Sequence, residues 1–177
     1  FASIEVRTPA DQPDVLVALN PAALRANIRD VRPSGMVIVN SDAFNAKSLK
    51  LAGYEGDPLP ELRDRYQLVE IPLTRLNRDA LAELEISQRD ADRSKNFFAL
   101  GLMYWLYNRP MEPTQRWLEA RFEGEVLAAN LRVLKAGYAF GETTDLLPVS
   151  FVVPRAKIEP GVYRNITGNA ALAWGIV

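Results

Sequence analysis

Short apolar runs divide the first part of the chain into alternating strands and helices. Residues 15–19 and 36–39 are continuous apolar runs, which is typical of strands that helices cover on both faces of a parallel sheet. Residues 66–71 alternate apolar and polar positions and end before Pro72, so they predict a third strand. We expect residues 15–19 to form a central strand of this sheet.

Helix-initiating residues follow each predicted strand. Asn20 and Pro21 are favoured at an N-cap and at the first helical position, which predicts a helix over residues 21–31. Two more helices are predicted in the same way: 43–52, opened by residues 40–42 and ended by Gly53, and 74–84, with Thr74 as its cap. This repeated order of strand and helix predicts an α/β fold.

The second half of the sequence is typical of helices. Ser87 with Asp90 three residues later resembles a capping box at the start of a long helix through residue 106. Pro110 and Pro113 interrupt the pattern, and further helices are predicted over residues 114–122 and 126–141. The last of these helices should bury one face made of Leu127, Leu131, Leu134 and Tyr138.

Segments near the two ends suggest a division into domains. Two more strands are predicted, an edge strand at residues 4–7 and a strand at residues 147–153 before Pro154. A small-residue helix should follow residues 167–169. We therefore expect a first domain over residues 1–155, a linker over 156–162 and the start of a second domain over 163–177. The abrupt ends indicate an internal piece of a longer protein.

The chain contains no cysteine and no histidine among its 177 residues. This excludes thiolate nucleophiles, cysteine-ligated clusters and catalytic imidazoles, and it leaves carboxylates, lysine, tyrosine and hydroxyl groups. The net charge of -1 gives no field that would attract nucleic acid or anionic lipid. The longest apolar run, residues 97–107, is shorter than the roughly 20 residues of a membrane helix. We expect no nucleic-acid or membrane partner, and the lack of cysteine favours a cytoplasmic location.

Asn20 and Asn40 are the best-placed candidates for binding a cofactor. Each stands where a predicted parallel strand ends and a helix begins, which is the edge where open α/β sheets bind ligands. Asparagine is also favoured at this place because it satisfies free helical N–H groups, and we prefer this explanation for both residues. Neither G-x-G-x-x-G nor G-x-x-x-x-G-K-[ST] occurs, so no motif indicates nucleotide binding.

Other polar and aromatic groups have simpler explanations than a site. Arg93, Lys95 and Asn96 could meet an anionic ligand, but a solvated helical turn also explains them. Glu142 and Asp145 could form an acid–base pair or a magnesium site, although a helix end is the better explanation. Residues 56–58 begin like a thiamine diphosphate motif, but a proline replaces its second glycine and the match is rejected. Five aromatic residues are assigned to the core: Phe97, Phe98, Tyr104, Trp105 and Tyr107.

Five segments must be considered together, namely ALNPAAL at 18–24, VNSDAF at 39–44, RSKNFFALG at 93–101, GYAFGETT at 137–144 and YRNITGN at 163–169. In their order and spacing they resemble the 2-oxoacid:ferredoxin oxidoreductases. The specific resemblance is to α subunits of the 2-oxoglutarate type, in which a γ domain precedes the α domain. It extends over almost the whole chain. The sequence departs from the pattern at Ala170, where many relatives have glutamate, and the family's Gly-rich first turn would precede Phe1.

The resemblance implies a Rossmann-like, mostly parallel sheet with added C-terminal helices. Residues 1–155 would be the γ domain and residues 163–177 the start of the α domain. The implied activity is the coenzyme A-dependent oxidative decarboxylation of a 2-oxoacid with electron transfer to ferredoxin. Thiamine diphosphate, Mg²⁺ and a [4Fe–4S] cluster would be held mostly by a partner β subunit, and none by this chain alone.

Two other functions are compatible with the residues. A non-catalytic α/β binding or scaffolding module would use its asparagines only as helix caps. A Rossmann-like transferase of another family would need a Gly-rich loop for its donor, and the sequence has none.

Overall fold

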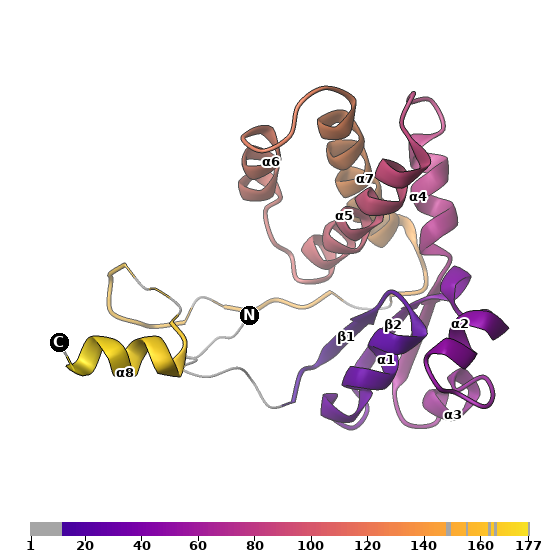
Figure 1. Cartoon of the computed structure of the whole chain (residues 1–177), viewed down its shortest axis with the longest axis horizontal. Coiled ribbons are helices and arrows are strands. Elements are labelled where there is room, and N and C mark those ends of the chain that lie inside the picture. The colour runs from indigo at the N-terminus through magenta and orange to yellow at the C-terminus, as the bar shows by residue number, and fades with distance from the viewer. Residues whose placement is uncertain (1–11, 148–149, 155, 163, 165, 177) are drawn as a thin grey trace. The chain divides into compact units, whose positions relative to one another are not determined.

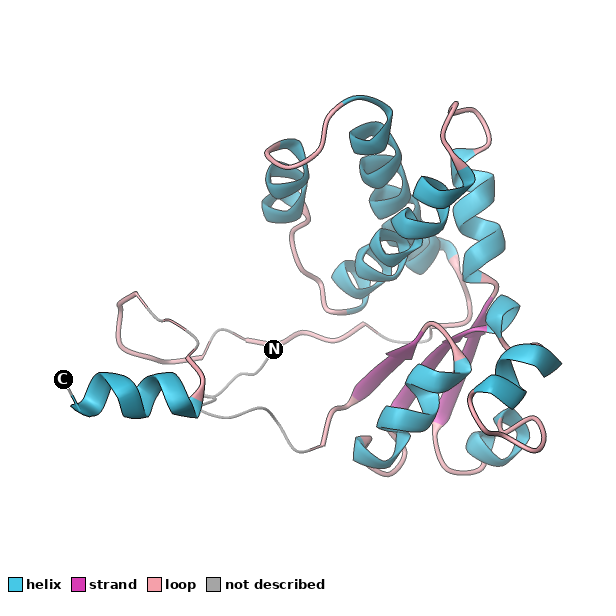
Figure 2. Cartoon of the chain, viewed as in Figure 1, coloured by secondary structure: helices cyan, strands magenta, loops and turns pink. Residues whose placement is uncertain are grey.

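A three-stranded parallel sheet organises the amino-terminal half of the protein (Figures 1 and 2). The computed structural model describes residues 12–147, 150–154, 156–162, 164 and 166–176. Strands β1 (Val15–Ala18), β2 (Met36–Asn40) and β3 (Gln67–Ile71) lie in the order β1-β2-β3, and both neighbouring pairs are parallel. The predicted α/β class and the three predicted strands are therefore confirmed. The strand predicted at residues 4–7 lies outside the described residues.

Among the three described strands β2 is the central one. All five residues of β2 are buried, whereas three of the four residues of β1 are only half-buried. Within the described sheet β1 pairs with β2 only, and residues 4–7 lie outside the described residues, so the central position predicted for residues 15–19 stays a prediction. An apolar run indicates that both faces of a strand are covered, but it does not indicate how many strands lie beside it.

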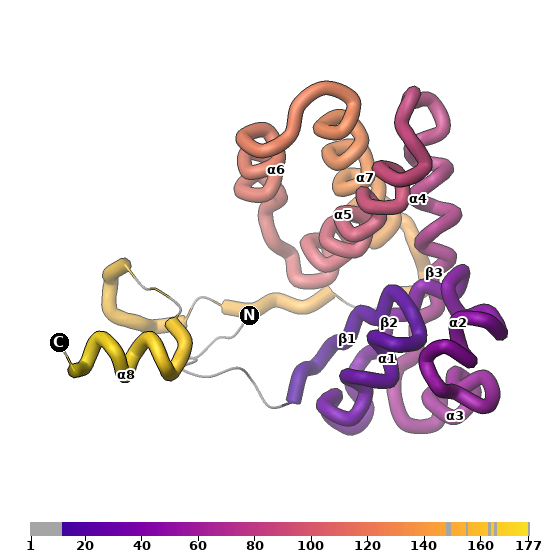
Figure 3. The backbone as a smooth tube through the Cα atoms, viewed as in Figure 1, coloured from indigo at the N-terminus to yellow at the C-terminus, as the bar shows by residue number. Residues whose placement is uncertain are grey.

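Helices cover both faces of this sheet, as the backbone trace shows (Figure 3). In chain order the helical elements up to residue 143 are α1 (Pro21–Asn27), the 3₁₀ turn η1 (Ile28–Asp30), the 3₁₀ turn η2 (Ser41–Ala43), α2 (Ala46–Leu51), α3 (Leu59–Arg63), α4 (Leu73–Leu81), α5 (Gln88–Leu106), α6 (Glu112–Glu119) and α7 (Gly124–Thr143). Helix α6 packs against α7. Alternate residues of β2 point to opposite layers. Val37 and Val39 join a core with α1 and α3, whereas Met36 and Ile38 join a core with α4, α5 and α7.

Several helix boundaries differ from the prediction. In place of one helix over residues 43–52, the chain forms η2 and then α2, which begins when the Asn45 side chain accepts a hydrogen bond from Ser48 N at 3.0 Å. Gly53 ends α2 with a φ of 79°, as predicted. Helix α6 starts two residues before the predicted Thr114, because Pro113 fits into a first turn where no N–H is needed.

Helices α5 and α7 pack so closely that their backbones touch (Figure 3). A Cβ on Gly101 would lie 2.0 Å from the carbonyl oxygen of Leu134, and a Cβ on Gly137 would lie 2.0 Å from that of Phe98. Of the face predicted for α7 only Leu134 is fully buried, and Leu127, Leu131 and Tyr138 are half-buried, because close approach favours small residues in the contact. The buried residues are Ala129, Asn130, Val133, Leu134, Gly137 and Gly141.

The carboxy-terminal region differs from the prediction at one place. No strand is found among the described residues of the segment 147–153, where Phe151 N donates a single backbone hydrogen bond to the Leu106 carbonyl at 2.6 Å. One compact unit ends at Val152. The predicted last helix is present as α8 (Gly168–Ile176), and Thr167 Oγ1 accepts from Ala170 N at its start. None of the helices in the described residues has the length and apolar content required to span a membrane.

Candidate functional site

The carboxyl ends of the three strands bring together residues that are far apart in sequence (Figure 1). Asn20 follows β1, Asn40 is the last residue of β2, and Thr74 lies in the first turn of α4, just after β3. This is the edge at which open parallel sheets bind ligands.

Asn40 joins β1, β2 and α4 through its side chain. It is 1% exposed. Its Nδ2 donates to Thr74 Oγ1 at 2.9 Å and to the Leu19 carbonyl at 3.5 Å, while its Oδ1 accepts from Thr74 N at 3.3 Å. Asn40 makes no capping hydrogen bond to the 3₁₀ turn that follows it. The expectation that it caps its own helix is therefore wrong, because its amide is used by a helix 34 residues away.

Helix α4 is capped from outside its own sequence. Pro72 occupies the N-cap position and supplies no side-chain acceptor, so the predicted cap at Thr74 is wrong. Thr74 N donates to Asn40 instead, and Arg75 N donates to Asp42 Oδ2 at 2.8 Å. The Arg75 Nε also lies 3.4 Å from Asp42 Oδ1. We did not predict from the sequence that Asp42 and Arg75 belong to this site. The sequence could have indicated it, because both residues follow predicted parallel strands, whose carboxyl ends lie at the same edge of a sheet.

Asn20 caps α1, as predicted, and also borders a small cavity. Its Oδ1 accepts from Ala23 N at 2.8 Å. The cavity has a volume of about 270 Å³ and is lined by Asn20, Pro21, Ala22, Ser48, Leu51 and Ala52. Leu51 is 80% exposed at this cavity. Within the described part of the chain no residue accepts a hydrogen bond from the Asn20 Nδ2, and the Asn20 side chain is exposed.

The cap at Asn20 gives a direct stability prediction. Replacing Asn20 by alanine should lower the free energy of unfolding by about 1 kcal/mol, because one orphan N–H of α1 loses its acceptor. Asn20→Asp is the matched control, since a carboxylate at an N-cap keeps the acceptor and favours the helix dipole. Urea denaturation of the three proteins measures both effects. Equal stability of the Asn20→Ala protein and the parent would contradict the assignment.

An arginine connects α1 to the end of α2 beside this cavity. Arg25 Nη1 donates to the Ala52 carbonyl at 2.9 Å, and its guanidinium lies 5.4 Å from the centre of the Tyr54 ring. Burial raises the pKa of Tyr54, and the positive charge of Arg25 partly offsets this increase. The Tyr54 phenol is therefore a neutral donor at physiological pH and does not act as a base.

The other sequence candidates do not join this site. Arg93 lies in the second turn of α5 and pairs with Asp90 at 3.8 Å, and Lys95 and Asn96 follow on the same helix. Glu142 lies in the last turn of α7 and Asp145 just beyond it, which is the helix end favoured by the sequence. Phe98 is buried in the core, as predicted, and the other four aromatic residues are half-buried around it.

The segment 93–101 also contains a buried structural contact. Asn77 Nδ2 donates to the Ala91 carbonyl at 2.8 Å, and Ser94 Oγ donates to the same carbonyl at 2.8 Å. The Asn77 bond connects α4 to α5, the Ser94 bond lies within α5, and both satisfy buried polar groups. They explain Ser94 without a ligand.

The carboxyl edge has the chemistry of a binding surface. Its groups are the amides of Asn20 and Asn40, the hydroxyls of Thr74 and Ser48, and the Asp42–Arg75 ion pair. Among these described residues no nucleophile is hydrogen-bonded to a base. In the described residues there is also no group of three Asp, Glu, His or Cys side chains that could hold a metal ion. The edge can therefore orient a ligand by hydrogen bonds.

The sequence of this chain is similar to those of known oxidoreductases. The family model described as "Pyruvate ferredoxin/flavodoxin oxidoreductase" matches residues 1–140. A curated protein from Mycobacterium tuberculosis, "2-oxoglutarate oxidoreductase subunit KorA", is 44% identical over 181 residues, which is 100% of this chain and 28% of that protein. The chain thus spans little more than a quarter of the length of this relative.

A solved structure agrees with the fold. The 2-oxoglutarate:ferredoxin oxidoreductase from Magnetococcus marinus, determined with 2-oxoglutarate, coenzyme A and succinyl-CoA bound, aligns with a TM-score of 0.60. The sequences are 22% identical, and the alignment covers 86% of this chain and 24% of the other. At this identity the likeness concerns the fold alone.

Proposed function

Because the chain belongs to the pyruvate ferredoxin/flavodoxin oxidoreductase family, we propose that it is part of the α subunit of a 2-oxoglutarate:ferredoxin oxidoreductase. The observation that carries this proposal is the 44% identity to KorA over the whole chain. The complete enzyme would decarboxylate a 2-oxoacid oxidatively, transfer the acyl group to coenzyme A and pass electrons to ferredoxin. A cytoplasmic location is part of the proposal.

The proposed division follows the sequence. Residues 1–155 would form the γ domain, residues 156–162 a linker and residues 163–177 the start of the α domain. The end of one compact unit at Val152 supports a boundary close to residue 155. A family match that ends at residue 140 is compatible with it.

The proposal assigns the redox cofactors to a partner subunit. A cysteine-ligated [4Fe–4S] cluster does not fit this chain, because it has no cysteine. Mg²⁺ with thiamine diphosphate needs oxygen ligands in a cluster, and the described residues offer no such group. We therefore place the cluster and the diphosphate site mostly on a β subunit that binds this one.

Within this chain, we propose that the carboxyl edge contributes to ligand binding. The Asn20 Nδ2 would donate a hydrogen bond to a ligand at the small cavity, because its Oδ1 is already used by α1. Asn40 would act as a positioning residue, since all its hydrogen bonds are made within the protein. It holds the ends of β1 and β2 and the start of α4 in one arrangement.

An activity assay tests the proposed function. We expect the full-length subunit that contains this chain, purified with its β subunit, to reduce ferredoxin when 2-oxoglutarate and coenzyme A are both present. Omitting coenzyme A is the control and should abolish the reduction. Activity with pyruvate but not with 2-oxoglutarate would contradict the proposed substrate. No activity with any 2-oxoacid would contradict the proposed enzyme.

Calorimetry separates the enzyme from the scaffolding alternative. Titration of coenzyme A into the same complex should give a saturable heat of binding. A scaffold that uses its asparagines only as helix caps predicts no specific heat. Heat of coenzyme A binding without ferredoxin reduction would mean that the wrong 2-oxoacid was supplied. The absence of both would mean that the complex is not this enzyme.

A further inference from the structure

A second cavity lies at the opposite edge of the sheet, before the strands begin. Its volume is about 570 Å³. It is lined by Gln12, Ile28, Arg29, Val31, Pro33, Leu62, Arg65 and Tyr66. These residues precede β1, follow α1 and end α3, so the cavity is built by loops at the amino ends of all three strands. It is therefore separate from the carboxyl edge.

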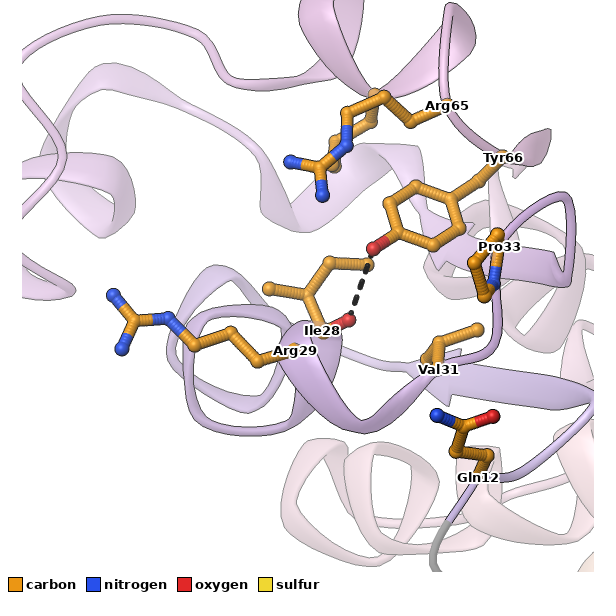
Figure 4. A pocket seen from close by; sticks show the side chains of 8 residues that line it. Gln12, Ile28, Arg29, Val31, Pro33, Arg65 and Tyr66 are labelled. Carbon is orange, nitrogen blue, oxygen red and sulfur yellow. Dashed lines mark hydrogen bonds between the residues drawn. The ribbon is translucent and has the colours of Figure 1, made fainter.

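The walls of this cavity are fixed by hydrogen bonds that need no ligand. Tyr66 Oη donates to the Ile28 carbonyl at 3.2 Å and thereby joins η1 to the start of β3 (Figure 4). Ser34 N donates to the Arg65 carbonyl at 3.1 Å, and Arg32 N donates to the Pro13 carbonyl at 3.3 Å. A cavity with fixed walls loses little conformational entropy when it binds a ligand.

The cavity combines an apolar floor with two cations. Val31, Leu62 and the Tyr66 ring are buried and form the apolar part. Arg29 and Arg65 extend from two different segments of the cavity lining. The Arg65 guanidinium lies beside the Tyr66 ring, whereas the Arg29 side chain lies on the far side of Ile28 and points away from Tyr66 (Figure 4). The Arg65 guanidinium lies 5.5 Å from the centre of the Tyr66 ring. No acidic residue lines the cavity in the described part of the chain.

The arginines around this edge fall into two classes. Arg32 pairs with Asp14 at 2.6 Å, and Arg63 pairs with Glu70. Arg29 and Arg65 line the cavity and have no carboxylate partner among the described residues. Two uncompensated charges at one cavity raise the local concentration of anions.

The two aspartates next to these arginines in the sequence do not neutralise the arginine charges. Asp30 follows Arg29 and Asp64 precedes Arg65, and both aspartates are exposed. Neither aspartate lines the cavity or forms an ion pair with a described residue. The guanidinium groups therefore remain available to an incoming oxyanion.

We propose that this cavity binds a small organic oxyanion whose apolar or aromatic body lies against Tyr66. Its charged group is held by Arg65 and by Arg29, whose exposed side chain turns toward the ligand on binding. Guanidinium groups match phosphate and carboxylate oxygens in a bidentate geometry. The buried apolar floor favours a ligand with a carbon body over a bare inorganic ion. The proposal is independent of the family activity, because it uses none of the carboxyl-edge residues.

Three small compounds test the proposal on the 177-residue chain. Phenyl phosphate, benzoate and inorganic phosphate are titrated separately, and binding is followed by amide NMR shifts around Arg29, Arg65 and Tyr66. We expect phenyl phosphate or benzoate to bind more tightly than inorganic phosphate, and the preferred one identifies the oxyanion. Equal affinity for inorganic phosphate would overturn the apolar part of the site, and no binding of any compound would overturn the site itself.

Charge-removing variants locate the site. Arg29→Gln and Arg65→Gln should each weaken binding by roughly tenfold or more, as expected for a lost charge-assisted hydrogen bond. Arg78→Gln is the matched control, because Arg78 is an exposed arginine on α4 outside the cavity. Thermal unfolding of each variant checks that the fold is kept. Equal weakening by Arg78→Gln would show binding to general surface charge and would contradict the proposal.

Discussion

Replacing Gly137 by alanine is expected to force helices α5 and α7 apart and to destabilise the protein strongly. The added Cβ would lie 2.0 Å from the carbonyl oxygen of Phe98, and its next neighbours are also backbone atoms that cannot rotate away. Overpacking typically costs about 1–3 kcal/mol and occasionally more. The gain in helix propensity from glycine to alanine is only about 1 kcal/mol. We therefore expect a net loss near the upper end of the overpacking range.

A melting experiment checks this expectation. For a protein of this size each kcal/mol lowers Tm by roughly 2–4 °C, so a clear decrease in Tm should be measured. Gly56→Ala is the control, because no atom lies within 4 Å of the position of its Cβ. An unchanged or increased Tm for Gly137→Ala would show that the two helices can move apart without loss of stability.

A variant with both Gly101 and Gly137 replaced by alanine tests whether separation of the two helices causes the loss of stability. Gly101 faces the Leu134 carbonyl in the same helix contact, so either substitution alone already forces the helices apart. The combined loss in Gly101→Ala/Gly137→Ala should therefore be smaller than the sum of the single losses. Additive losses would mean that the two contacts are independent.

Local signals predicted those parts of the fold that depend on neighbouring residues. The apolar run at β2, the cap of α1 by Asn20 and the cap of α5 by Ser87 were all predicted and are present. Each of these features depends on residues within one or two turns of each other. Gly53, which ends α2, belongs to the same class.

Features that depend on distant contacts could not be predicted in this way. Asn45, and not the strand end, begins α2, because the chain first forms a 3₁₀ turn after β2. The α5–α7 contact selects glycines for backbone approach, whereas the amphipathic pattern had indicated leucines. At the candidate site, the position of Asn40 was predicted correctly but its partner was not. The sequence gives no local sign that its amide serves a helix 34 residues away.

This distant contact leads to the second large effect. Asn40→Ala is expected to lower the free energy of unfolding by roughly 3 kcal/mol, since each buried group left without a partner costs about 1–3 kcal/mol. The substitution removes the acceptor of Thr74 N and the donor to Thr74 Oγ1 and the Leu19 carbonyl. Helix α4 cannot replace this cap, because Pro72 has no side-chain acceptor. Urea denaturation measures the loss, and faster hydrogen exchange of the Thr74 amide would locate it.

Two further variants separate the buried hydrogen bonds from the mere loss of an asparagine. Asn27→Ala is the control, because the Asn27 side chain is exposed and donates one bond to the Ala23 carbonyl, so its loss should be small. Asn40→Asp keeps the acceptor for Thr74 N but places a carboxylate against the Leu19 carbonyl, and burial would raise the pKa of the new carboxyl. A group whose pKa is raised in the folded state destabilises it above the unfolded pKa, so the Asp variant should recover stability as the pH falls. A loss in Asn40→Ala no larger than in Asn27→Ala would show that the edge of the sheet is held by other contacts.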